Sequence, residues 1–116
     1  MNLKLIKQYN QKNLDFSQAD LRGIEAHRVD LSGANFIKKD LRGADFSETN
    51  LSRANLTEAS LSMVRLHRTS LEEADLTKAY AISTYLDQVI FYNTCLKETR
   101  FRGLEILEVY LKAVRV

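Results

Sequence analysis

Proline is absent from this chain of 116 residues, and only one cysteine, Cys95, is present. A single cysteine cannot form a disulfide within the chain, and it gives no basis for a cysteine-based metal site. Long apolar runs are also missing, so no segment is expected to cross a membrane. The first residues carry lysines but no continuous apolar stretch of the secretory kind, which favours a cytoplasmic location.

An excess of charge of one sign is lacking as well. Lys and Arg number 17 against 15 Asp and Glu, which gives a formal net charge of +2. This balance argues against a nucleic-acid binder and against a strongly acidic mimic of nucleic acid. Hydrophobic residues make up 45% of the chain, which is enough for the core of one domain and too much for compositional disorder.

The chain does contain a five-residue repeat. Of the twenty positions reached by steps of five from Phe16 to Leu111, eighteen are Leu, Phe or Ile and two are Ala. These three residue types make up 28 of the 116 residues, so chance would supply about five. Two residues before each of these positions, sixteen of twenty are Ala, Val or Thr. Each repeat therefore has a small inward residue, a spacer and a large inward residue.

Neither an α-helix nor a flat strand accommodates this period. A step of five rotates by about 140° around a helix, so the large residues would not form one face. A strand alternates with a period of two, so an odd step would move the large residue to the opposite face in each repeat. A chain that turns a corner after each short extended segment keeps both residues inside. The pattern predicts an all-β solenoid.

Five triplets in the sequence carry a family resemblance. They are Ala19-Asp20-Leu21, Ala34-Asn35-Phe36, Ala44-Asp45-Phe46, Ala54-Asn55-Leu56 and Ala74-Asp75-Leu76. They resemble the A(D/N)LXX repeat of the pentapeptide-repeat proteins, and the resemblance covers about residues 14–103. It implies a right-handed quadrilateral β-helix with four repeats per coil, about five coils in this chain, and residues 20 apart stacked on one another.

This fold gives the missing proline a physical reason. Each coil must hydrogen-bond to its neighbours, and proline has no amide to donate. Gly23, Gly43 and Gly103 each lie two residues after a large inward residue, where a corner needs dihedral angles that glycine adopts easily. Asp or Asn just before the large residue is expected to bond backbone amides at the turns.

The pattern divides the chain into an N-terminal cap at 1–13, the β-helix at 14–103 and a C-terminal cap at 104–116. The first cap is expected to be a short helical or irregular lid, because Gln11 stands where a large apolar residue belongs. The second cap is either a last coil, in frame, or a helix that gathers its polar residues on one side. We favour the helix, in which Glu108 and Lys112 form a favourable pair.

Stacking at 20 residues converts the sequence into surface columns. Arg22 and Arg42 would interleave with Asp20 and Asp40 as an exposed ladder of ion pairs, and we prefer this to an anion-binding edge. His67 would lie one layer from Asp87, but no nucleophile accompanies them. His27 would lie two layers from His67, too far for a shared metal ion. No catalytic, cofactor or metal site is therefore predicted.

Two residues depart from the repeat. Cys95 stands where the repeat normally has Asp or Asn, and it is expected to point outward as a surface thiol. Lys39 interrupts the small inward column. Its side chain is expected either to reach out through a corner or to distort the backbone locally.

Large apolar residues replace small polar ones on the outer walls late in the chain. They are Tyr80, Ile82, Tyr85, Ile90, Tyr92, Leu107 and Tyr110. Exposed patches rich in tyrosine are typical of protein contacts, although an aromatic ladder can also simply shield backbone edges. We predict a protein-contact patch occupied by a second copy of the chain or by its own C-terminal segment.

Two functions remain. The first is a non-enzymatic module that binds an unknown protein partner or forms a homodimer through its C-terminal coils. The second is implied by the family resemblance, since one branch mimics DNA and binds a topoisomerase, gyrase. That branch needs a dominantly negative wall, whereas residues 14–103 have a net charge of about −1. This chain is also shorter than the long rods that the resemblance implies for that branch. We predict the first, with no enzymatic activity, no cofactor, no membrane and no nucleic acid.

Overall fold

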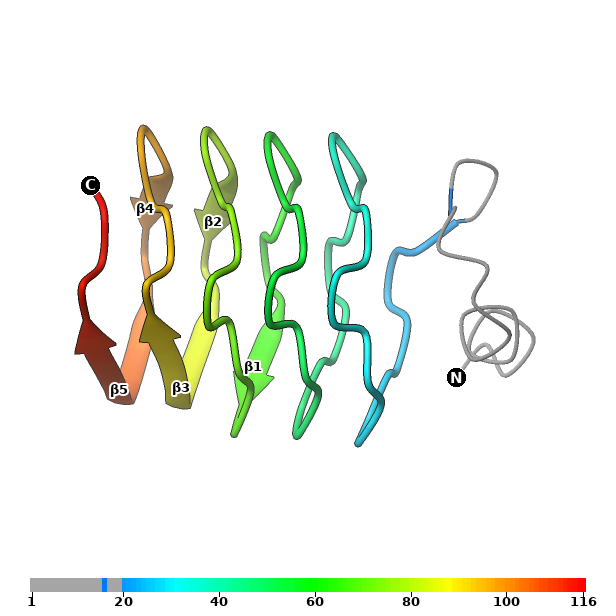
Figure 1. The fold of residues 1–116 in the computed structure, drawn as a ribbon. Coiled ribbons are helices and arrows are strands. Elements are labelled where there is room, and N and C mark those ends of the chain that lie inside the picture. The colour runs from blue at the N-terminus through cyan, green and yellow to red at the C-terminus, as the bar shows by residue number, and fades with distance from the viewer. Residues whose placement is uncertain (1–15, 17–19) are drawn as a thin grey trace.

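The computed structural model describes Phe16 and residues 20–116, and its chain winds around one axis in stacked turns (Figure 1). Parallel bridges join residues 20 apart, as in the series Glu25–Asp45, Asp45–Arg65 and Arg65–Tyr85. The backbone therefore has the 20-residue register that the family resemblance implies. The fold measures 33 × 23 × 22 Å.

Five segments pair over enough residues to form strands, and all their pairings are parallel. The strands β1 (Arg65–His67), β3 (Tyr85–Tyr92) and β5 (Glu105–Lys112) form one sheet in the order β1–β3–β5. The strands β2 (Tyr80–Ile82) and β4 (Arg100–Arg102) form a second sheet. The described residues contain no helix, which confirms the all-β prediction for this part of the chain.

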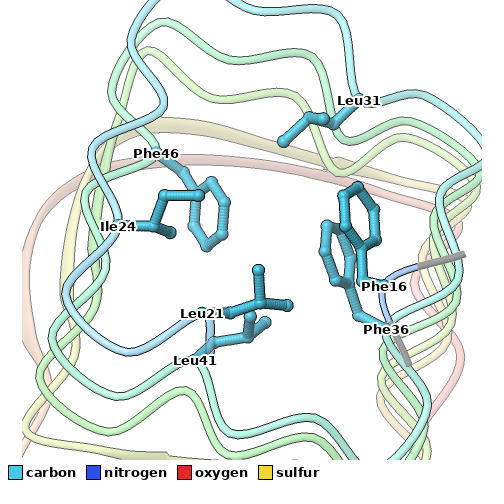
Figure 2. Close-up of a pocket in the computed structure, with 7 residues that line it drawn as sticks. All are labelled: Phe16, Leu21, Ile24, Leu31, Phe36, Leu41 and Phe46. Atoms are coloured by element: carbon cyan, nitrogen blue, oxygen red, sulfur yellow. The ribbon is translucent and has the colours of Figure 1, made fainter. Parts of the chain in front are cut away.

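The core is built from the five-residue repeat. Every predicted large inward residue from Phe16 to Phe91 is buried, and small residues such as Ala44, Val64 and Ala74 fill the space beside them. At the N-terminal end of the described core, the ring of Phe16 stacks on that of Phe36 at 5.1 Å between centroids (Figure 2). Periodic burial of this kind supplies most of the stabilising free energy of a narrow solenoid.

The corners use a left-handed backbone. From Gly23 to Gly103, each residue two positions after a large inward residue has φ between +51° and +73°. Gly23, Gly43 and Gly103 adopt this conformation as predicted, and Gly33 is a further glycine at an equivalent corner. The predicted side-chain caps are also present: the carboxylates of Asp30 and Asp45, for example, accept hydrogen bonds from the amides two residues on.

Threonines in the small inward column connect successive turns. The buried hydroxyl of Thr69 donates to the carbonyl of Phe46 at 2.8 Å, and those of Thr84 and Thr94 donate to carbonyls 23 residues earlier. Thr49 makes the equivalent bond to Ala26. A buried hydroxyl without a partner would be destabilising, so these bonds explain why threonine is accepted inside the coil.

The preferred prediction of a C-terminal helix is wrong. Residues 105–112 form β5, and its pairing with β3 places Val109 opposite Val89 and Leu111 opposite Phe91. Pairing with β3 satisfies backbone groups and continues the coil, whereas the Glu108–Lys112 pair of a helix is worth only a few tenths of a kcal/mol, about 0.2–0.5. The N-terminal cap predicted at 1–13 lies outside the described residues. Over the part of the chain that is described, no helix could cross a membrane.

Candidate functional site

The predicted neighbours His67 and Asp87 do meet on an outer wall. β1 pairs with β3 so that the two residues are opposite one another, with His67 Nδ1 3.0 Å from Asp87 Oδ2. His27 Nε2 lies 2.9 Å from Asp45 Oδ2 on the same wall. Ser47 donates to Asp45 and not to either histidine. The histidines are therefore held by carboxylates of the next turn, with no nucleophile bonded to them.

The carboxylate of Asp45 is stabilised in its charged form. Burial opposes its ionisation, but hydrogen bonds from Ser47 and His27 outweigh burial and hold the pKa of Asp45 below its ordinary value. Within the described part of the chain, no three His, Cys, Asp or Glu side chains come together as a metal site. This wall thus presents histidine–carboxylate contacts that join successive turns.

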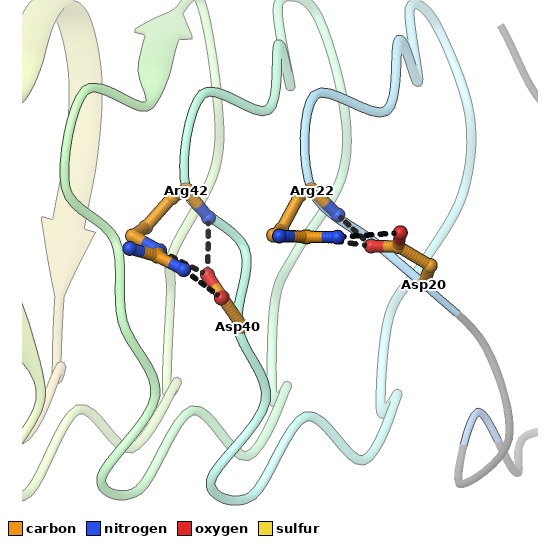
Figure 3. A network of polar contacts seen from close by, with 4 residues as sticks. All are labelled: Asp20, Arg22, Asp40 and Arg42. Carbon is orange, nitrogen blue, oxygen red and sulfur yellow. Dashed lines mark hydrogen bonds and ion pairs between the residues drawn. The ribbon is translucent and has the colours of Figure 1, made fainter.

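The arginine column differs from the predicted interleaved ladder. Arg22 forms a two-pronged bond with Asp20, and Arg42 forms the same bond with Asp40, each within one turn (Figure 3). Hydrogen bonds from these guanidinium groups lower the pKa of both carboxyls. The residues immediately before and after an inward residue lie on the same wall, which brings Asp20 beside Arg22 and Asp40 beside Arg42. Both arginines already have anionic partners, so this edge offers little to an external anion.

Ion pairs that do span successive turns occur at the corners. Arg28 Nε lies 2.8 Å from Glu48 Oε2, and the ammonium groups of Lys38 and Lys78 lie 3.8 Å from the carboxylates of Glu58 and Glu98. Each pair joins corner residues 20 apart. These pairs were not predicted from the sequence, although a spacing of 20 between opposite charges at the corner position indicates them. As exposed pairs they contribute little to stability.

Cys95 is buried, contrary to the predicted surface thiol. Its exposed fraction is 5%, and its sulfur lies 3.4 Å from the hydroxyl of Thr77. Backbone bridges place Cys95 between Asp75 and Arg115, so the residues of the adjacent turns cover it. A side chain at an outward position of the repeat can therefore be buried when larger side chains of the two adjacent turns cover it.

Lys39 causes no distortion of the backbone. Its amide bonds the carbonyl of Phe36 at 3.0 Å, as the amide of Ala44 bonds that of Leu41 at the equivalent corner. The side chain is half-buried. The second of the two alternatives, a local distortion of the backbone, is therefore wrong.

The predicted contact patch is divided between two sheets. Tyr80 and Ile82 lie in β2 and are exposed, and the ring of Tyr80 carries the guanidinium of Arg100 at 5.2 Å. The other five residues lie in β3 and β5. Among them Ile90 is opposite Tyr110 and Tyr92 is opposite Lys112, so Ile90, Tyr92 and Tyr110 form one continuous group, here called the tyrosine wall.

A second exposed apolar surface was not predicted from the sequence. Phe101, Ile106, Leu111 and Val116 continue the inward positions of the repeat, yet all four are exposed at the C-terminal end of the coil. Their inward phase predicted burial, but burial also requires a following turn. At the opposite end of the described core, the cavity among Phe16, Ile24, Phe46 and their neighbours measures only about 10 Å³ (Figure 2). That space holds one water at most and is lined by apolar groups, so it is packed core and not a ligand site.

The repeat is matched by a known family model. The model for pentapeptide repeats, in eight copies, matches residues 12–47, 27–62, 40–72 and 65–103. No curated protein was found to match the chain.

Several solved structures resemble the fold. The pentapeptide repeat protein Rfr23 from the cyanobacterium Cyanothece 51142 is 30% identical, with 78% of this chain and 63% of that chain covered and a TM-score of 0.57. The pentapeptide repeat protein alr5209 from Nostoc PCC 7120 is 20% identical, with 92% and 96% covered and a TM-score of 0.55. A trypsin-treated form of QnrB1, a plasmid-mediated fluoroquinolone resistance protein, is 16% identical, with 81% and 63% covered and a TM-score of 0.53. The chain thus spans less than two thirds of the Rfr23 and QnrB1 chains, and the likeness to alr5209 and QnrB1 concerns the fold alone.

Proposed function

This chain belongs to the pentapeptide-repeat family, and on that premise we propose that it is a non-enzymatic protein–protein interaction module. We infer that its fold is the right-handed quadrilateral form of about five coils. The module presents flat walls of side chains at fixed spacing and acts by binding a protein partner along one of them. The tyrosine wall is the contact surface.

The observation that carries this proposal is the composition of the tyrosine wall. In the earlier turns the equivalent outward positions hold Asp30, Asn50 and Ser70, whereas the last two turns hold Ile90 and Tyr110. Tyr92 stands beside them in β3. Aromatic and apolar residues enriched on one part of an otherwise polar surface are typical of the centre of a protein interface.

The charge distribution supports this function over DNA mimicry. Basic and acidic side chains are equal in number over residues 20–116, and the pairs at Asp20–Arg22, Asp40–Arg42 and Arg28–Glu48 alternate in sign along the surface. A surface of this kind has no extended negative potential to imitate a phosphate backbone.

The proposal is tested by capture of proteins from an extract of the native cells on immobilised full-length chain. The double variant Ile90→Ser/Tyr92→Ser is compared with Ile37→Ser, a control that removes an exposed isoleucine from another wall. At least one protein is expected to bind both the native chain and the control. The double variant is expected to capture about one tenth as much of that protein, or less. If no captured protein distinguishes the two variants, the wall is not a contact surface.

A separate measurement addresses gyrase. DNA supercoiling by purified gyrase is expected to be unchanged when the chain is added. Inhibition that survives the Ile90→Ser/Tyr92→Ser change would favour the DNA-mimic function instead.

A further inference from the structure

The wall that carries His67 is hollowed along its sheet. The open hollow measures about 580 Å³ and follows β1, β3 and β5, which lie side by side (Figure 1). It is lined by side chains from four successive turns, namely Ser47, Arg65, His67, Tyr85 and Glu105. This volume is within the usual range of ligand sites, about 300–1,000 Å³. The tyrosine wall lies on the next side of the coil, beyond the corner at Gln88.

Two columns of side chains form the flanks of the hollow. The pairing of β1 with β3 and of β3 with β5 puts the first column in register, and its members are Arg65, Tyr85 and Glu105. The second column contains Ser47 and His67. Serine is short, and the ring of His67 is held by Asp87 of the next turn, with Nδ1 3.0 Å from Oδ2. The space between the two columns is therefore left open.

Arg65 and Glu105 give the hollow opposite charges two turns apart. Both side chains are exposed, and among the described residues neither has an ion-pair partner. Asp45, one turn before Arg65, already bonds two other side chains. The half-buried ring of Tyr85 lies between the two charges in the register. A guanidinium, an aromatic ring and a carboxylate are therefore available to a ligand in this order.

The mixed charge of the hollow limits which ligands fit it. A purely anionic ligand at Arg65 is repelled by Glu105 and by Asp87, and a purely cationic ligand at Glu105 is repelled by Arg65. A ligand with one charge of each sign is attracted at both positions. The lining therefore favours a segment that carries an acidic and a basic side chain.

A hollow of similar size near β2 lacks such available charges. It measures about 520 Å³, and its basic groups already have partners. Lys78 Nζ lies 3.8 Å from a carboxylate oxygen of Glu98, and the guanidinium of Arg100 lies 5.2 Å from the centre of the Tyr80 ring. Of these two hollows, the one along β1, β3 and β5 is equipped for an external ligand, and the one near β2 provides an internal comparison.

The spacing of the two charges selects the conformation of the ligand. Two turns of the coil correspond to about 9.6 Å, twice the distance between adjacent strands. Residues three apart in a polyproline II segment point in the same direction at about 9.3 Å. A strand repeats its facing side chains at about 6.8 Å, and an α-helix returns to one face at about 6 or 10.5 Å, so both fit less closely. We propose that the hollow binds a proline-rich segment of a partner protein in which an acidic and a basic residue are three positions apart.

The contacts of such a segment follow from the lining of the hollow. The acidic side chain pairs with the guanidinium of Arg65, and the basic side chain pairs with Glu105. The two prolines between them lie against the ring of Tyr85, as proline-rich segments lie on aromatic side chains in known recognition modes. A polyproline II segment is largely ordered before it binds, so little conformational entropy is lost.

This inference goes beyond the proposed function, because it concerns a different wall and is tested with the purified chain and a synthetic peptide. The capped peptide PPEPPKPP is added to the full chain at up to about 5 mM, since a short segment with few contacts binds weakly. Two-dimensional amide NMR spectra are expected to change at β1, at Tyr85 to Asp87 and at Glu105, and to stay constant at β2. Spectra that do not change, or that change at β2 alone, overturn the proposal.

Two control peptides test the spacing and the conformation. PEPPPKPP has the same composition, but its charges are four positions apart and point in different directions from a polyproline II segment. PPEGGKPP keeps the spacing, but its two glycines make the segment flexible. Each control is expected to bind about fivefold more weakly than PPEPPKPP, or weaker still. If either control binds as tightly as PPEPPKPP, the proposal of a polyproline II segment with this spacing is wrong.

Matched variants of the chain test the two charges. Arg65→Gln and Glu105→Gln each remove one exposed charge, and each is expected to weaken binding of PPEPPKPP about fivefold. Arg102→Gln makes the same change of charge at an exposed arginine of β4 and is expected to bind like the native chain. Native-like binding by Arg65→Gln, or equal losses in Arg65→Gln and Arg102→Gln, overturns the proposal. Ile90→Ser/Tyr92→Ser is expected to bind the peptide normally, so loss of protein capture in that variant concerns the tyrosine wall and the two proposals fail separately.

Discussion

At the scale of single residues, the left-handed backbone of the corners restricts most strongly which residue types can occupy a position. Within the described residues, fourteen residues other than glycine adopt positive φ, and none of these is β-branched. Left-handed backbone costs an L-residue roughly 1–2 kcal/mol, and a branched Cβ is the least compatible with it. Corner amides such as that of Arg53, which donates to Glu72 at 2.9 Å, offset part of this cost by bonding the next turn.

Met63 allows the cost of left-handed backbone to be measured, because its side chain is exposed and its φ is +60°. Met63→Val is expected to lower the free energy of unfolding, because a branched Cβ adds to the left-handed cost that methionine already bears. Met63→Gly is expected to leave it unchanged or to raise it slightly, since relief of the left-handed cost is offset by the greater freedom of unfolded glycine. Urea unfolding of the three proteins measures the order. Equal stability of the valine and glycine variants would contradict the strain argument.

Buried threonines act at the same scale by a hydrogen bond. Thr69→Val keeps the shape of the side chain but removes the donor to the Phe46 carbonyl, so stability is expected to fall by about 1 kcal/mol. The loss stays small because that carbonyl also accepts a bond from the amide of Thr49. Thermal unfolding checks the value, with Thr69→Ser as the control that keeps the hydroxyl. If the valine variant is the more stable, packing and not the hydrogen bond decides this position.

At the scale of the repeat element, an Asp or Asn just before a large inward residue accepts a hydrogen bond from a backbone amide at the following corner. Asp30, Asp40 and Asp45 all accept the amide two residues on, and each of these carboxyls has a lowered pKa. A carboxyl whose pKa is lower in the folded state stabilises the fold above its unfolded pKa of about 3.9. That contribution is lost as the pH falls through the lower, folded value.

The melting temperature is therefore expected to fall as the pH is lowered below about 4. Asp45→Asn keeps an acceptor oxygen but has no charge to lose, so its melting temperature is expected to depend less on pH between 5 and 2.5, roughly. Circular dichroism melts of the native chain and the variant over this range provide the measurement. A variant with the full acid dependence would show that Asp45 does not contribute to it.

Much of each repeat element could be predicted from the sequence, because the five-residue spacing fixes which residues are inside and where the corners lie. Phe36, Leu41 and the corner glycines follow directly from that spacing. The pairing of Arg22 with Asp20 could not be predicted in this way, since a column gives the neighbours of a residue but not the conformation of its side chain. Cys95 was misjudged for the same reason, because its cover depends on the size of neighbours in adjacent turns.

At the scale of the whole molecule, the ends set the limits of what the repeat pattern could predict. The choice between helix and coil at 104–116 depends on whether β3 offers an edge to pair with, which no local pattern contains. Exposure of Phe101 and Leu111 likewise follows from the lack of a covering turn and not from their own spacing. The candidate contact residues were named from the sequence, but their division between two sheets became visible only in three dimensions.

Because the chain turns a corner about every five residues, a change in its length also changes the direction in which the later walls face. Removal of five residues would advance everything beyond the cut by one side, so that a wall would face a new direction. Removal of twenty, for example residues 56–75, would join Asn55 to Leu76 in phase and shorten the stack by about 4.8 Å. The height of this molecule and the direction in which its tyrosine wall faces can thus be altered independently of each other.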